Sequence, residues 1–190
     1  MSAIRKWWVV FRNPEARIDF GDDVYLGPGC GVHAPFGGEL VIGSRVEFRR
    51  GVRIELARDA KLTIGEGTRF TYYVVIQCGR KIEIGARCVF AQAALVVDGN
   101  HRFRDLTRPI LEQGYDLRAL RIDDDVAVMA KCTVLANVGR RSFIGANSVV
   151  SRDLPPYVVA VGAPAHPIDY FGPEGAEPVE PSASRSDRSG

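Results

Sequence analysis

The sequence has no apolar run long enough to span a bilayer, and it carries almost no net charge. Over 190 residues, 25 basic and 23 acidic side chains leave a formal charge of +2, so nothing attracts the whole chain to nucleic acid or membrane. Residues 7–11 are apolar but too few for a signal peptide. We therefore expect one domain with no nucleic-acid partner and no membrane insertion. Residues 1–19 form a leader whose amphipathic segment packs on the body, with weak membrane-surface docking as the minor alternative.

The motifs of several common chemistries are also missing. There are only three histidines, His33, His101 and His166, and no C-x-x-C pair, so the three converging ligands of a zinc site are not expected. No serine or cysteine stands in a G-x-S-x-G elbow. The 20 glycines form neither a Walker nor a dinucleotide fingerprint. We expect no metal and no covalent nucleophile.

What the sequence does contain is a six-residue apolar repeat. Anchors recur at Phe20, Leu26 and Val32; Ile42, Phe48 and Ile54; Ile64, Phe70 and Ile76; Ile84, Phe90 and Val96; and Ile122, Val128 and Val134. Glycine follows the first anchor of each of the first four triplets. A fixed short period is typical of a β-solenoid, in which each coil buries its apolar side by stacking on its neighbours. The repeat predicts an all-β fold of three-sided coils built from short strands.

The repeat also accounts for most of the cysteines. Cys30, Cys88 and Cys132 each stand four places after an anchor, where the other repeats place small or β-branched residues. This register favours buried free thiols over disulfides. Free thiols persist in a reducing compartment, so we expect a cytoplasmic protein.

The repeat is interrupted twice before it ends. Residues 102–121 form a long insertion containing five arginines, and a loop of this length inside a domain is more often functional than not. We expect the register to slip after Val134, with Val138 to Ile144 two residues too short for a full side. Pro155 and Pro156 then end the solenoid. Residues 166–171 are expected as a short helical segment, and residues 172–190, rich in Pro, Glu, Ser and Gly, as a disordered tail.

His101 is the histidine that closes a regular coil and opens the insertion. That position suits a general base with a pKa near the working pH. Asp98, three residues earlier, either orients the imidazole or has a structural role at the corner. On the residues alone, a lone histidine at a corner is more often structural.

Several segments together resemble the hexapeptide-repeat acyltransferases, in particular the branch that acetylates sugars and antibiotics. They are the repeats, the segment Val97-Asp98-Gly99-Asn100-His101 with the loop that follows it, the run from Ile144 to Pro156, and Gly162-Ala163-Pro164-Ala165. The resemblance covers residues 20–171. The repeats alone would also fit sugar nucleotidyltransferase tails and γ-class carbonic anhydrases, which on this fold would be metal-dependent.

The resemblance implies a left-handed parallel β-helix and a homotrimer with active sites between subunits. It implies acetyl-CoA or another acyl-CoA as co-substrate, with no permanently bound cofactor, and a small hydroxylated acceptor such as a saccharide. His101 would be the catalytic base, with Asp98 beside it. Ala146 matches a position whose backbone contacts CoA, and Arg152 a position where a basic residue meets a CoA phosphate.

The fifth coil departs from the family's pattern. Asp123, Ala127 and Met129 replace a glycine, a tryptophan and a second glycine, and His166 replaces the lysine that usually closes the motif. The leading hypothesis is an O-acyltransferase. These departures motivate the alternative, a catalytically silent β-helix that serves as a binding or assembly module.

Overall fold

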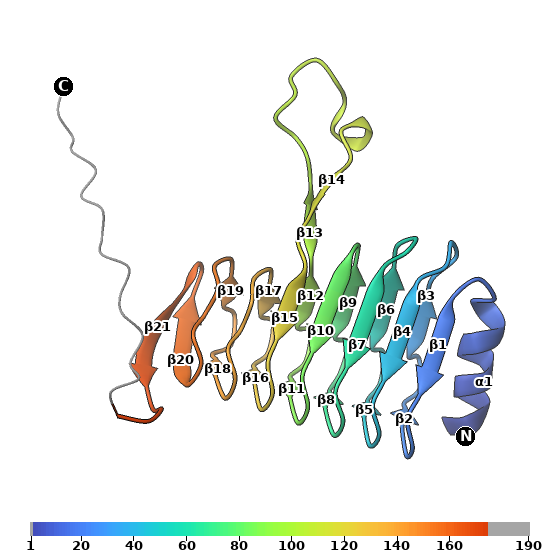
Figure 1. The fold of residues 1–190 in the computed structure, drawn as a ribbon, viewed down its shortest axis with the longest axis horizontal. Helices are drawn as coiled ribbons and strands as arrows, with labels where there is room; N and C mark the ends of the chain where they lie inside the picture. Colours follow the sequence, from blue (N-terminus) through green and yellow to red (C-terminus); the bar gives the residue numbers. More distant parts are fainter. Residues whose placement is uncertain (1, 175–190) are drawn as a thin grey trace.

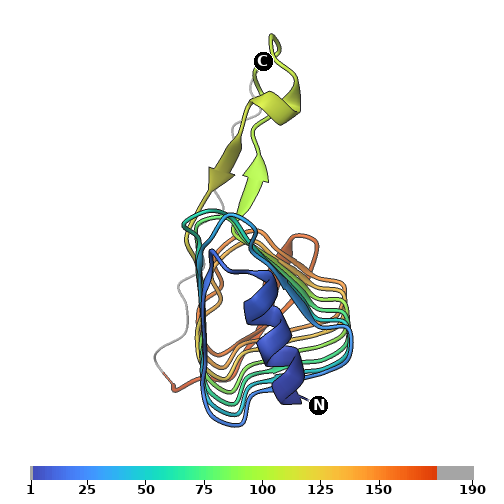
Figure 2. The ribbon, with the colours of Figure 1, turned by 90° about the vertical axis from the view of Figure 1, so that its right-hand side faces the viewer.

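The computed structural model describes residues 2–174. Short parallel strands from successive coils stack into three sheets, which form the sides of a triangular prism (Figures 1 and 2). The chain winds through sheet I, sheet II and sheet III in turn, and each of the first five coils adds one strand to each sheet. The last coils join sheet I only through the isolated bridges of Val138 and Leu154. The fold is a left-handed parallel β-helix, as the sequence led us to expect.

Each of the three sheets is made of short strands, one below the other along the stack. Sheet I contains β1 (Arg17–Phe20), β4 (Glu39–Ile42), β7 (Lys61–Ile64), β10 (Lys81–Ile84) and β15 (Leu120–Ile122). Sheet II contains β2 (Tyr25–Leu26), β5 (Glu47–Phe48), β8 (Arg69–Phe70), β11 (Val89–Phe90), β16 (Ala127–Val128), β18 (Phe143–Ile144), β20 (Val158–Gly162) and β21 (Ala165–Tyr170). Sheet III contains β3 (Gly31–His33), β6 (Arg53–Leu56), β9 (Val75–Cys78), β12 (Leu95–Val97), β17 (Thr133–Val134) and β19 (Val149–Val150).

The six-residue anchors stack in register through the centre of the prism. Phe48, Phe70 and Phe90 are paired row by row in sheet II, and all three are buried. Their ring centroids lie 5.0 and 4.8 Å apart, in nearly parallel planes. Because every coil repeats the same anchor, one apolar column runs through the stack, and each coil is stabilised by the coils above and below it.

Glycine after the first anchor is required by the close approach of successive corners. A Cβ atom built on Gly65 would lie 2.4 Å from the carbonyl carbon of Gly85 in the next coil. That distance is far inside van der Waals contact and involves backbone, which cannot turn aside. The glycines therefore mark the edge where sheet I passes into sheet II.

The register slips after Val134 as expected, but the expectation that Val138 to Ile144 is too short for a full side was wrong. Val138 pairs with Ile122 and then with Leu154, and Ile144 continues the row of Val128, so Val138 to Ile144 is a full side. The shortening falls earlier, because Val138 follows Val134 by four residues whereas Ile84 follows Ile76 by eight. The last coils therefore pass from sheet III to sheet I through a shorter turn.

The ends of the stack are closed by two different elements. Helix α1 (Ser2–Arg12) crosses the N-terminal end, where Val9 is buried against the first coil (Figure 2).

At the other end, the expectation of a helical segment at residues 166–171 is wrong. Those residues belong to strand β21, which pairs antiparallel with β20. The last parallel strand has unpaired backbone groups, and an antiparallel strand satisfies them. The residues expected as a disordered tail lie, from 175 onwards, outside the described part.

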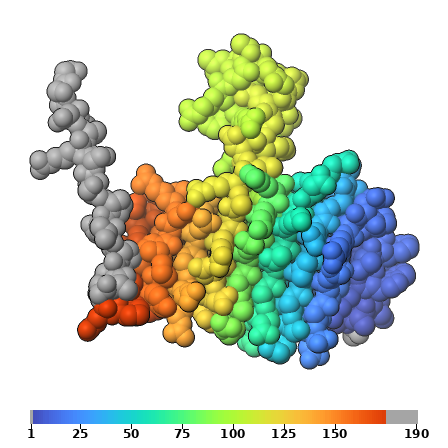
Figure 3. Space-filling model, in the orientation of Figure 1, coloured from blue at the N-terminus to red at the C-terminus, as the bar shows by residue number. Residues whose placement is uncertain are grey.

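The insertion forms a hairpin that stands away from the prism (Figures 1 and 3). Strands β13 (Gly99–His101) and β14 (Tyr115–Leu117) pair antiparallel, and the short 3-10 helix η1 (Ile110–Glu112) lies in the loop between them. The hairpin leaves the edge where sheet III passes into sheet I. The division into a leader, a solenoid and a tail remains a prediction.

Candidate active site

His101 lies at the outer end of β13, where the hairpin leaves the body. Its side chain is exposed, and its backbone pairs with Tyr115 of β14. The two rings are 4.3 Å apart between centroids and inclined by 39°. The imidazole is thus held on one side by an aromatic ring, and no hydrogen bond occupies its nitrogens within residues 2–174.

Asp98 does not contact His101. Its carboxylate is buried and accepts three backbone hydrogen bonds, at 2.6 Å from Gly79 and at 2.8 Å each from Arg80 and Lys81. Gly79 and Arg80 form the turn between β9 and β10, and Lys81 is the first residue of β10. Of the two roles the sequence left open, the geometry matches the structural one. Asp98 fixes the turn below the hairpin.

The base of the hairpin is attached to a later coil by a pair that sequence reasoning missed. The Arg118 guanidinium donates to both carboxylate oxygens of Asp153, at 3.1 and 2.9 Å. Asp153 also accepts from the backbone and the side-chain amide of Asn137. The partners are 35 and 16 residues apart in sequence, and no local motif announces them.

Further out, the hairpin contains a cleft of about 370 Å³ lined mainly by arginine and acidic side chains. The lining residues are Arg102, Phe103, Arg104, Asp105, Arg108, Gln113 and Asp116. Arg102 is paired with Asp116 at 2.7 Å. A larger groove of about 740 Å³ lies on sheet II of the first coils, lined in part by Tyr25, Arg50 and Tyr72. His101 lines neither of them.

The two residues expected to contact CoA lie in the last coils, on two different edges of the prism. Ala146 is exposed in the turn from β18 to β19, at the edge between sheets II and III. Arg152 is exposed just after β19, at the edge between sheets III and I, and next to Asp153. His101 therefore shares an edge of the prism with Arg152, whereas Ala146 lies on a different edge.

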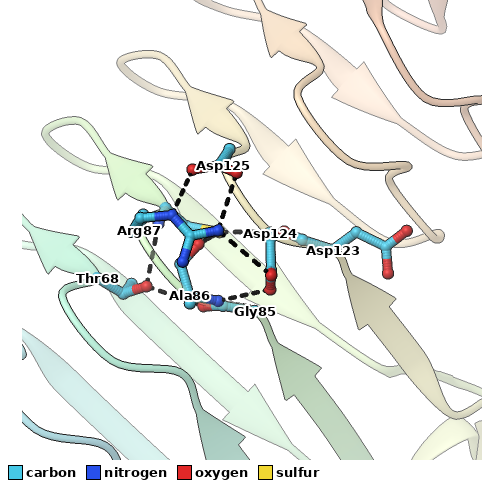
Figure 4. Close-up of polar contacts among 8 residues, drawn as sticks. Thr68, Gly85, Ala86, Arg87, Asp123, Asp124 and Asp125 are labelled. Carbon is cyan, nitrogen blue, oxygen red and sulfur yellow. Dashed lines mark hydrogen bonds and ion pairs between the residues drawn. The ribbon is translucent and has the colours of Figure 1, made fainter.

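The acidic run of the fifth coil is accommodated by an ordered corner (Figure 4). Asp124 accepts a hydrogen bond from the backbone of Ala86 at 2.9 Å, the contact that Ser44 makes with Asp22 in the earlier coils. Asp125 accepts two bonds from Arg87, at 2.7 and 3.0 Å. The Asp123 carboxylate points away from this cluster in Figure 4. Although Asp123 stands where the earlier coils have glycine, the hydrogen bond between successive corners is retained in this coil.

We expect the Arg87–Asp125 pair to make a small, pH-dependent contribution to stability. The Arg87 hydrogen bond lowers the pKa of Asp125. Such a contribution is present above the ordinary aspartate pKa and is lost as pH falls through the lowered one. Arg87→Gln should lower the free energy of unfolding at neutral pH only slightly, because water screens the exposed Arg87 guanidinium. Urea titrations at several pH values should show the deficit disappearing in acid. Arg140→Gln, which removes an exposed arginine with no ion pair in the described part, should show no such trend.

The cysteines are structural. All four are free, and Cys78, Cys88 and Cys132 are buried while Cys30 is half-buried. Burial raises the pKa of Cys88 to about 11, and burial together with the Asp98 carboxylate raises that of Cys78 to about 12. Thiols of this kind are protonated at neutral pH and poor nucleophiles. Across residues 2–174, no three His, Cys, Asp or Glu side chains come together as a group that could hold a metal ion.

No family model matches the chain. It is 34% identical over 166 residues to a Mycobacterium tuberculosis protein named "Probable acetyltransferase Rv3034c", an alignment that covers 85% of this chain and 55% of that protein. The chain spans about half the length of the curated relatives it matches.

Solved structures show the same fold. A hexapeptide-repeat acetyltransferase from Vibrio cholerae O1 biovar eltor, in complex with acetyl coenzyme A, matches with a TM-score of 0.62 at 20% identity, over 91% of this chain and 79% of that one. The polysialic acid O-acetyltransferase OatWY matches with a TM-score of 0.58 at 20% identity, over 88% and 90%. The chain therefore has the left-handed β-helix fold of the hexapeptide-repeat proteins and is similar in sequence to a protein named a probable acetyltransferase.

Proposed function

We propose that this chain is an acyl-CoA-dependent O-acetyltransferase that acts on a hydroxyl of a sugar or a sugar-containing metabolite. The observation that carries the proposal is the placement of His101, exposed where the hairpin leaves the stack, in a chain whose relatives are acetyltransferases. OatWY and a maltose O-acetyltransferase from Clostridium difficile are among the structures with this fold, which supports a saccharide acceptor.

In this mechanism His101 removes the proton of the acceptor hydroxyl as its oxygen attacks the thioester carbonyl of acetyl-CoA. The tetrahedral intermediate collapses with loss of the CoA thiolate, which takes up a proton, and the acetyl ester leaves as product. A backbone N–H facing the cleft stabilises the oxyanion, a contact whose loss typically costs ~10²–10³ in rate. No enzyme nucleophile takes part, in keeping with the raised pKa of the buried thiols. Four free cysteines also favour a cytoplasmic setting.

We propose that the site is completed by a neighbouring copy in a homotrimer. His101 and Ala146 lie on different edges of the prism, so a base from one copy and a CoA-contacting backbone from another could face the same cleft. Arg152 would then reach a CoA phosphate. Rings form by heterologous contacts, in which two different patches of each subunit meet.

Two such patches are present on the outer surfaces of sheets II and III. In sheet II, the row Val89, Ala127, Phe143 and Val159 is apolar across four successive coils. In sheet III, the corresponding row is Val75, Leu95, Thr133 and Val149. In the coils that it shares with those rows, the outer face of sheet I is charged instead, with Lys61, Lys81, Glu83 and Arg121. The row of sheet II is charged only in the earlier coils, at Glu47 and Arg69. This distribution favours sheets II and III as the subunit contacts and sheet I as the solvent-facing side.

Leu95→Glu should weaken the trimer, because it places a charge in a contact that excludes water. We expect the dissociation constant for assembly to rise at least about tenfold, or 1.4 kcal/mol. Light scattering over a dilution series measures this. The control Lys61→Glu changes the charge on sheet I and should leave assembly unaltered. Equal behaviour of the two variants would contradict the assignment of faces.

The function itself is tested by calorimetry with CoA and by acyl transfer from acetyl-CoA to a panel of saccharides. A saturable heat of CoA binding, together with the release of one free CoA for each acetyl group transferred, supports the enzymatic function. The alternative is the silent binding or assembly module, motivated by Asp123, Ala127 and Met129, and it predicts no saturable heat. The absence of both signals in a correctly assembled protein would overturn the proposal.

A further inference from the structure

Helix α1 exposes an aromatic face at the N-terminal end of the stack. The residues at i, i+3, i+4 and i+7 of this face are Ile4, Trp7, Trp8 and Phe11, whose exposed fractions are 70%, 62%, 50% and 60%. Residues at this spacing lie on one side of a helix. Large apolar side chains gathered on one exposed face typically mark an interaction site.

The aromatic face belongs to a helix that is fixed to the folded body. The Phe11 ring lies 5.1 Å from Trp7 and 5.8 Å from Trp8. The hydroxyl of Ser2 accepts from the backbone of Leu26, and Arg5 donates to the carbonyl of the same residue at 2.8 Å. The exposure is therefore a property of the docked helix, which presents its aromatic side chains as one patch.

The charges of the helix are of one sign. α1 contains Arg5, Lys6 and Arg12 and no acidic residue. Basic residues combined with tryptophan and phenylalanine are typical of helices that lie at the surface of an anionic bilayer. Tryptophan prefers the headgroup level because its ring is apolar and its N–H is polar.

A basic cleft opens beside the aromatic face. It has a volume of about 330 Å³ and lies between α1 and the first strands of sheet III. Arg12, His33 and Arg53 line it, and Glu55 is its one acidic lining residue. Arginine recognises phosphate oxygens through its fork of donors. The cleft thus places phosphate-binding groups next to the side chains that would enter the lipid surface.

We propose that the α1 end of the prism docks on an anionic phospholipid surface. Ile4, Trp7, Trp8 and Phe11 enter the boundary between headgroups and acyl chains, and Arg12 and Arg53 contact lipid phosphates. The docking is peripheral, because the apolar side chains lie on one face of a helix that is fixed to the folded body. No helix within residues 2–174 is long and apolar enough to cross a membrane. It does not depend on the proposed acyl transfer.

The chain provides its own probe for this proposal. Its two tryptophans are Trp7 and Trp8, so intrinsic tryptophan fluorescence reports on α1 alone. The protein is mixed with phosphatidylcholine vesicles that contain or lack phosphatidylglycerol. With phosphatidylglycerol we expect a blue shift of the emission and quenching by brominated acyl chains, both weakened by salt. With phosphatidylcholine alone we expect little change.

The double variant Ile4→Ser/Phe11→Ser retains both tryptophans and should partition at least about tenfold more weakly, because two apolar side chains no longer enter the lipid. The control Leu111→Ser removes an exposed apolar side chain of the hairpin, 84% exposed, and should bind like the parent. Circular dichroism verifies that each variant folds. The proposal is overturned by an emission that does not respond to anionic vesicles, which is also the result expected if another protein copy covers the helix. Equal binding by the double variant and the parent would overturn it as well.

Discussion

Replacement of His101 by alanine is expected to lower the rate of acyl transfer by about 10²–10⁴-fold, the usual contribution of a general base. The imidazole is exposed at the base of the hairpin, and within the described residues its nitrogens are not engaged by the protein, so it is available to an acceptor hydroxyl. The effect should appear in kcat more than in the affinity for CoA. The measurement is release of free CoA in the presence of an acceptor found by the saccharide panel.

The loss must be attributed to the base and not to damage of the stack. His101 is exposed, so its removal should leave the free energy of unfolding within about 0.5 kcal/mol of the parent. The matched control His166→Ala removes another exposed histidine, in β21, and should retain the parent rate. If His101→Ala is as active as the parent in an intact assembly, the mechanism with His101 as base is refuted. The separate proposal that the protein binds CoA would be unaffected.

Replacement of Asp98 by alanine is expected to lower the free energy of unfolding by about 3–5 kcal/mol. Three backbone N–H groups, of Gly79, Arg80 and Lys81, lose their acceptor, and each unsatisfied donor costs about 1–3 kcal/mol. Arg80 and Lys81 are exposed, so water recovers part of this cost and the total stays at the lower end of the sum. Urea denaturation monitored by circular dichroism measures the loss. Asp98→Asn retains an acceptor oxygen and should have an intermediate stability.

The matched control is Asp116→Ala, which removes an exposed carboxylate of the hairpin that is paired with Arg102. Exposed pairs contribute little, so its stability should change by less than about 1 kcal/mol. The comparison also separates the two roles considered for Asp98. If Asp98→Ala lost activity but had the same free energy of unfolding as the parent, Asp98 would act through the imidazole of His101. That result would contradict the structural role assigned to Asp98 from the hydrogen bonds of its carboxylate.

Much of the fold could be predicted because burial in a β-helix is a local and periodic property. An apolar side chain every six residues specifies which atoms face the core, and the rows Ile42–Ile64–Ile84 and Phe48–Phe70–Phe90 follow directly. The errors lie where periodicity ends. Residues 166–171 were expected to be helical, but they belong to β21, which pairs with the free edge of β20. The residues of β21 alone do not show that this edge is available. The short turn lies just before Val138 and was assigned to the side that follows it. The length of a turn can be judged only by comparison with the equivalent turn of the neighbouring coil.

The candidate site was predictable only in part. The insertion made His101 conspicuous, since it stands where the repeat stops. The partners of Asp98 could not be found, because they lie on the preceding coil and are backbone groups without a side-chain signal. The Arg118–Asp153 pair joins residues 35 positions apart. The exposure of Trp7 and Trp8 was equally hidden, because an amphipathic pattern does not say how much of the apolar face the body covers.

The solenoid, the composition of its core and the place where the core pattern stops all follow from the order of the residues. These depend on the polarity and spacing of neighbouring residues. The tertiary structure alone decided that Asp98 serves the turn below the hairpin, that His101 and Ala146 lie on different edges, and that α1 leaves its aromatic face uncovered. Those features depend on which residues of successive coils meet across the stack, and that is set by the turn lengths and the winding of the whole chain.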